Sequence, residues 1–186
     1  AKPAQADSIE LMAGNNSATI DLKASASITP RLGLFLRARP SVDYTGRLGA
    51  FGVWDISINL TGGLGAVGEV QLIDGRVIPR AGLQYFAKVG DFSLYALGTT
   101  GLDSAPYVET LTALRYVPVL YKDLRLLTQV ENITDVSPGG HDFSTQRIRL
   151  GIELNGWGVG AAGDLTEMGS NPGPGDGTFG WNIGGF

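Results

Sequence analysis

The 186-residue sequence contains no cysteine, only one histidine and few charged residues. Without cysteine, the protein has neither disulfide bonds nor thiolate metal sites. Charged residues make up 17% of the chain, and they form no long basic cluster of the kind that binds nucleic acid. No apolar run approaches the roughly 18 residues that a transmembrane helix requires. The sequence therefore excludes disulfide-rich and nucleic-acid-binding proteins and predicts no membrane-spanning helix.

Glycine, in contrast, is abundant, with 28 residues, and hydrophobic residues make up 43% of the chain. This hydrophobic content argues against a disordered chain. Glycine argues against a helical bundle, because it costs about 1 kcal/mol per helical position relative to alanine. The composition is typical of an all-β protein.

Apolar and polar residues alternate along most of the chain. Between residues 18 and 29, every second residue is alanine, isoleucine or leucine, and the residues between them are polar. This period of two is the signature of a strand with one apolar face. About twelve such runs occur, three of them weak, over residues 8–13, 18–29, 31–39, 48–60, 64–72, 77–89, 92–98, 108–116, 124–131, 147–154, 157–165 and 178–185.

The lengths and connections of these runs favour a membrane barrel over a soluble β-sandwich, which remains the alternative. Many runs have about 9–12 residues, as tilted membrane-crossing strands do, whereas strands of soluble sheets usually have about 5–6. Short connections mostly alternate with long ones, which are expected at residues 40–47, 99–105, 133–142 and 166–177. Outer-membrane barrels have short turns at one end, long loops at the other, and aromatic residues at both membrane interfaces. The aromatic residues predicted at the interfaces are Trp54, Tyr85, Phe92, Tyr116, Trp157, Phe179 and Trp181.

From about Ile9 to Phe186, the chain resembles bacterial outer-membrane β-barrels. It ends in Phe186, and a terminal aromatic residue is typical of that family, although Phe186 has the parity of polar Asn182 rather than of the apolar residues. The resemblance implies an antiparallel up-and-down transmembrane β-barrel of about twelve strands with both termini periplasmic. Residues 1–7 would form a periplasmic tail and residues 8–186 the barrel, in the outer membrane of a bacterium after removal of a signal peptide.

Most of the charged residues fall on the polar parity, which a barrel turns toward its lumen. The predicted pore-lining residues are Lys23, Arg37, Arg39, Arg80, Lys88, Arg115, Arg125, Arg147, Arg149, Asp21, Asp55, Glu69, Glu109, Glu131 and Glu153. Arginine binds carboxylates and phosphates through a planar fork of donors. One hypothesis is therefore a narrow Arg-lined pore for small anionic solutes, and in this respect the chain resembles monomeric porins for acidic sugars.

The alternative hypothesis is a closed structural or accessory barrel, in which the inward cations and anions neutralise one another. Such a barrel would anchor, or belong to, a larger envelope complex. The partners predicted by the two hypotheses are outer-membrane lipid, a small anionic solute and envelope proteins, with no cofactor and no metal.

An enzyme is the third class considered. His141 and Ser144 lie three positions apart in a segment expected to be a loop, and on a regular strand such residues face opposite sides. Nucleophilic catalysis requires them within hydrogen-bond reach of each other. The sequence therefore predicts no catalytic site and no enzyme.

Overall fold

The described part of the chain consists almost entirely of β-strands. The computed structural model describes residues 8–73, 75–102 and 107–169, the backbone of 178–186, and the side chains of 180–186. The predicted tail at residues 1–7 lies outside this range. The strands are β1 (Ser8–Gly14), β2 (Ser17–Ser27), β3 (Leu32–Asp43), β4 (Leu48–Thr61), β5 (Leu64–Ile73), β6 (Arg76–Val89), β7 (Phe92–Gly101), β8 (Val108–Tyr116), β9 (Val119–Tyr121), β10 (Leu124–Ser137), β11 (Gly140–Leu154), β12 (Trp157–Met168) and β13 (Thr178–Gly185). In the described part of the chain, no helix is long and apolar enough to cross a membrane.

The strands form one closed antiparallel barrel, as predicted. Neighbours in sequence pair with each other, and β13 pairs with β1 to close the ring. The short strand β9 continues β8 after an interruption, and both pair with β10. The ring therefore has twelve strand positions, which confirms the expected number.

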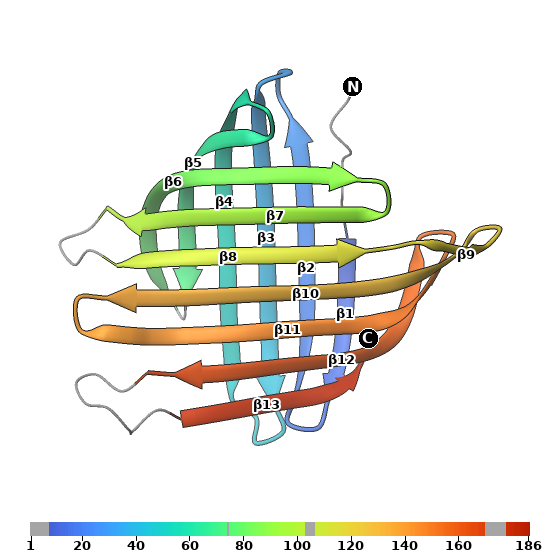
Figure 1. Ribbon diagram of the computed structural model, residues 1–186. Coiled ribbons are helices and arrows are strands. Elements are labelled where there is room, and N and C mark those ends of the chain that lie inside the picture. Colours follow the sequence, from blue (N-terminus) through green and yellow to red (C-terminus); the bar gives the residue numbers. More distant parts are fainter. Residues whose placement is uncertain (1–7, 74, 103–106, 170–177) are drawn as a thin grey trace.

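The barrel is flattened, because Arg37 on β3 reaches Glu131 on β10 in the opposite wall. Figure 1 shows β1–β4 as one layer, and β7, β8 and β10–β13 as a second layer that runs across the first. Sheets packed in this crossed manner enclose a thin interior that side chains can fill. The two layers bring strands from opposite sides of the ring close together.

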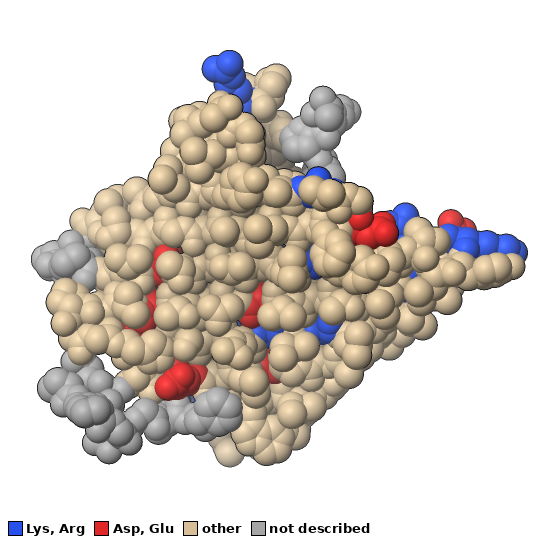
Figure 2. Space-filling model, in the orientation of Figure 1, with Lys and Arg blue, Asp and Glu red and all other residues tan. Residues whose placement is uncertain are grey.

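The barrel buries polar residues and exposes apolar ones. Among the described residues, fifteen polar or charged residues are buried against five apolar ones. Large apolar residues on the other parity are exposed on every long strand, for example Ile56 at 49% and Leu150 at 54%, and Figure 2 shows a face largely without charge. A soluble sandwich has the opposite arrangement, so that alternative is excluded, and the exposed surface is suited to lipid.

Several predicted loops are shorter than expected. The predicted loop at 133–142 is wrong, because β10 extends to Ser137 and β11 begins at Gly140, leaving only Pro138 and Gly139 between them. The strand alternation continues through this segment, and pairing of the two strands satisfies its backbone hydrogen bonds. The loops expected at 40–47 and 166–177 are also shorter, because β3 runs to Asp43 and β12 to Met168.

The ring closes at a narrow seam between β1 and β13. Only two residue pairs join these strands, Ala13 with Gly185 and Gly14 with Gly184. A side chain at Gly184 would collide with the backbone of Ala13, so the close approach requires glycine. The backbone of Phe186 continues the pairing of β13 with β12 without a register shift.

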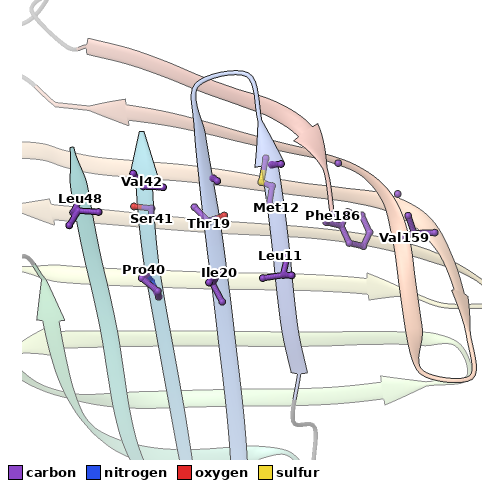
Figure 3. Close-up of a pocket in the computed structure, with 14 residues that line it drawn as sticks. Leu11, Met12, Thr19, Ile20, Pro40, Ser41, Val42, Leu48, Val159 and Phe186 are labelled. Atoms are coloured by element: carbon purple, nitrogen blue, oxygen red, sulfur yellow. The ribbon is translucent and has the colours of Figure 1, made fainter. Parts of the chain in front are cut away.

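Next to this seam lies an apolar groove of about 680 Å³. Figure 3 shows side chains of β1–β4 on one side of it and Val159 and Phe186 on the other. Its lining includes outward Leu11 and Ile20 as well as inward Met12. The groove therefore lies where the two ends of the sheet meet.

Three of the aromatic residues predicted at the interfaces, Phe92, Tyr116 and Trp157, lie at strand ends. Trp157, at the start of β12, is 84% exposed, and Phe92 stacks on Tyr116 at a centroid distance of 4.2 Å. Trp54 departs from the prediction, because it pairs with Leu36 and lies in the middle of β4 rather than near an end. The other predicted girdle residues with described side chains, Tyr85 and Trp181, are half exposed. The side chain of Phe179 lies outside the described residues.

Candidate functional site

The interior places most of the predicted pore-lining residues deep inside the barrel. The buried members of the set are Asp21, Arg37, Asp55, Glu69, Arg80, Glu109, Glu131, Arg147 and Arg149. Lys23, Arg39 and Glu153 are partly buried. Lys88, Arg115 and Arg125 are exposed, because they lie near the ends of β6, β8 and β10, where inward parity does not bring burial.

Arg37 connects two opposite walls of the barrel. Its guanidinium group forms a fork with Asp21 on the neighbouring strand, with distances of 2.9 Å (Nε–Oδ1) and 2.7 Å (Nη2–Oδ2). The same Nη2 lies 3.1 Å from Oε1 of Glu131 on β10. β3 and β10 occupy the third and ninth places in the ring. An ion pair therefore crosses the full width of the lumen.

Arg147 binds four carboxylates at the same level. Its nitrogens lie 2.9 Å from Asp21, 3.0 Å from Glu131, 3.4 Å from Glu10 and 3.6 Å from Asp164. These acids come from β2, β10, β1 and β12, so one guanidinium group ties four strands together.

Two more arginines complete this cluster. Arg149 lies 2.8 Å from both Glu10 and Asp164, and Arg39 also binds Asp164. We call the group made by Glu10, Asp21, Lys23, Arg37, Arg39, Glu131, Arg147, Arg149 and Asp164 the central ion-pair cluster.

A second cluster surrounds Arg80, whose side chain is fully buried. Its Nε donates to Thr99 at 3.0 Å, and its Nη1 donates to Gln71 at 2.9 Å and to Glu109 at 3.4 Å. The guanidinium group also lies over the ring of Tyr107, 4.6 Å from its centroid. This part of the interior is therefore filled by side chains as well.

The Arg80 cluster contains more acids than bases. Asp135 and Glu69 lie 3.6 Å and 3.8 Å from Arg80, and Asp55 is the register partner of Glu69. Among the described residues, no group of histidine, cysteine and acidic side chains has the geometry to hold a metal ion. The surplus carboxyl groups lie side by side instead.

Sequence reasoning missed Asp135 because its segment was predicted to be a loop. Asp135 has the same parity as Glu131, and this spacing would have placed it inside the barrel if the strand had been extended. One of its carboxylate oxygens pairs with Arg80. The alternation of apolar and polar residues therefore indicates an inward Asp135, but the predicted loop boundary excluded this residue from the strand.

The outer face also has an unexpected polar region, which we call the outer polar patch. It covers the loop-side ends of β8, β10, β11 and β12. Its members alternate along these strands with buried inward residues such as Glu109, Glu131 and Thr145, so they face outward. They are Thr110, Thr112, Asn132, Thr134, His141, Ser144, Gln146 and Glu167.

Two members of this patch correct the prediction about His141 and Ser144. The register between β10 and β11 shifts so that Val136 pairs with His141 and Asp135 with Phe143, leaving Asp142 as the extra residue of a β-bulge. The bulge turns His141 to the same side as Ser144. The His141 Nε2 atom lies 2.8 Å from the Ser144 Oγ atom. The expectation that these residues face opposite sides is therefore wrong.

Comparison with known proteins leaves the family open. No family model matches the sequence, and no curated protein sequence matches it. Among solved structures, the chain is similar to LpxR from Salmonella typhimurium, with a TM-score of 0.44 and 10% identity, over 92% of this chain and 88% of that chain. The chain has the fold of an outer-membrane-type β-barrel.

The prediction that the chain is not an enzyme is also corrected, because it rested on His141 and Ser144 facing opposite sides, and the two side chains are in contact. At this level of similarity the likeness concerns the fold alone, and the predicted similarity to porins for acidic sugars stays a prediction.

Proposed function

We propose that this protein is a bacterial outer-membrane barrel with a sealed lumen, which serves as a membrane-embedded scaffold. It is the closed alternative of the two hypotheses raised by the sequence. The observation that carries the proposal is the ion pair between Arg37 and Glu131, which joins diametrically opposite strands.

The size of the barrel makes this contact informative. Eight strands already enclose an interior just wide enough for side chains to fill, so a round barrel of twelve strands would leave space between opposite walls. Here flattening brings the walls within reach of one arginine and one glutamate. A solute that crossed the lumen at this level would have to separate buried, multiply bonded ion pairs.

The arginines of the interior are also unavailable to a passing anion. Arg37, Arg147 and Arg149 each contact two or more carboxylates. A selective pore needs fixed charges that are free to bind the permeating ion. The exposed cations Lys88, Arg115 and Arg125 lie near one end of the barrel and do not form a continuous path through it.

The lipid-facing surface and the sealed interior together suit a scaffold. The exposed apolar residues of all long strands would anchor the barrel in lipid. In this proposal the termini are periplasmic, and envelope proteins bind at the ends of the barrel that project from the membrane.

Electrical recording across a planar lipid bilayer tests the sealed lumen. We expect the wild-type barrel to insert without stepwise conductance. The variant Arg37→Ala/Glu131→Ala removes both partners of the cross-lumen pair, and we expect it to produce small conductance steps. Steady conductance of the wild-type protein with anion preference would overturn the proposal and support the Arg-lined pore.

A further inference from the structure

The outer polar patch is flanked by apolar residues on β8 and β10. On its loop side, Val108 and Val136 are 46% and 40% exposed. On its other side, Leu114, Val130 and Ile148 are 42–45% exposed. Apolar residues therefore border the patch toward the middle of the barrel on β8, β10 and β11, and toward the loops on β8 and β10. On β8 and β10 the polar residues therefore lie between apolar ones, which strands that simply leave the membrane would not explain.

The patch is built from aligned rows of side chains. Thr110, Thr134, Ser144 and Glu167 are consecutive register partners across four strands. In the next row, Thr112 pairs with Asn132, which pairs with Gln146, and Asn132 Nδ2 donates to Thr134 Oγ1 at 3.2 Å. From the row of His141 and Val136 to the row of Gln146 and Asn132, the patch spans about 13 Å along β10 at the usual rise per residue.

From this arrangement we propose that the outer polar patch is a hydrolytic site for ester-linked membrane lipids, with Ser144 as nucleophile and His141 as general base. The two reacting atoms are 2.8 Å apart, within the reach that an activated serine requires. The Asp142 bulge, which an ordinary hairpin does not need, creates this contact. Both side chains are partly exposed on the outer face, so a lipid can reach them from the side.

The position of the patch selects the substrate class. Ester bonds of membrane lipids lie at the boundary between the polar headgroups and the hydrocarbon core. The patch provides polar groups for a headgroup, and exposed Val130 and Ile148 below it provide a surface for an acyl chain. The amide group of Gln146, two residues from Ser144 on the same face, is a donor of the kind that stabilises a developing oxyanion.

The reaction follows from these groups. Nε2 of His141 accepts the hydroxyl proton as Ser144 Oγ attacks the ester carbonyl carbon. The tetrahedral intermediate collapses, the C–O bond to the lipid alcohol breaks, and the imidazolium gives its proton to the leaving oxygen. A water molecule, deprotonated by His141, then attacks the acyl-serine. This step releases the fatty acid and restores the Ser144 hydroxyl.

Release of fatty acid from vesicles tests this inference. The folded barrel, verified by its heat-modifiable gel mobility, is inserted into vesicles of a diacyl ester phospholipid. We expect the wild type to release fatty acid, and Ser144→Ala and His141→Gln to reduce the rate by at least about a hundredfold, the usual scale of a general-base contribution. Ser93→Ala, on β7, is the matched control and should keep the wild-type rate. Vesicles of the corresponding ether lipid should remain intact.

A covalent label provides a second readout. A fluorophosphonate bearing an alkyl chain should phosphonylate Ser144 in the wild type, as located by mass spectrometry, and should fail to do so in His141→Gln. A short water-soluble ester that is cleaved while lipid vesicles are not would overturn the lipid specificity. Absence of both hydrolysis and labelling in the folded wild-type barrel would overturn the proposal as a whole. Neither result depends on whether the lumen conducts.

Discussion

The central ion-pair cluster makes a quantitative prediction about Arg147. Replacement by methionine keeps a long side chain but removes the partner of four carboxylates. Arg147 is 4% exposed, as is Glu131. Loss of one partner from a buried ion pair costs about 3–5 kcal/mol. Because Arg37 still binds Glu131 after the change, we expect Arg147→Met to lower the free energy of unfolding by about 3 kcal/mol, the lower end of that range.

Urea unfolding of the barrel in lipid vesicles measures this change. The tryptophans Trp54, Trp157 and Trp181 are all exposed on the outer face, so their fluorescence reports the loss of lipid contact. The control is Arg125→Met, which removes the same charge from an exposed position of β10 and should change stability by less than about 0.5 kcal/mol. If Arg147→Met costs less than about 1 kcal/mol, the cluster does not hold the walls together and the reasoning is wrong.

Two further predictions concern the seam and the acidic surplus. Gly184→Ala should weaken ring closure and lower the urea midpoint of unfolding, because its Cβ would overlap the backbone of Ala13. The control Gly98→Ala places its Cβ in open space and should leave ring closure intact. Equal urea midpoints for the two variants would contradict the close approach of β13 to β1. Asp55→Asn should raise the free energy of unfolding by up to about 1 kcal/mol, because it removes the like charge opposite Glu69. A lower stability of Asp55→Asn in the same urea assay would show that Asp55 and Glu69 do not repel each other.

The sequence predicted the inside and outside of the barrel because the side-chain period of a strand is two. Once the alternation was assigned, residues such as Arg37 and Glu131 were placed in the lumen, and the structure agrees. Their partners could not be predicted, because pairing across the lumen depends on how far the barrel flattens, and no local pattern reports that shape. The alternation also fails near strand ends, where Lys88 has inward parity but lies exposed.

The contact between His141 and Ser144 on the outer face was not predicted, for a different reason. A bulge adds one residue to a strand and reverses the parity of everything beyond it. Pro138 and Gly139 suggested an open loop, and the strand pairing that forces the bulge involves β10, which the prediction ended at residue 131. A shift of the strand register by a single residue therefore decides whether His141 and Ser144 face opposite sides or are in contact.

The ion pairs inside the barrel also constrain the order in which it can be assembled. Arg37 and its partner Glu131 are 94 residues apart in the chain, and Arg149 and its partner Glu10 are 139 residues apart. Contacts between such distant segments form late, after most of the entropy of the chain has been lost. Until then, the interior charges need water, since an unpaired charge in hydrocarbon is very costly. A half-built sheet of this protein cannot enter lipid with its polar face uncovered, so closure of the ring and passage into the membrane must occur together as one cooperative event.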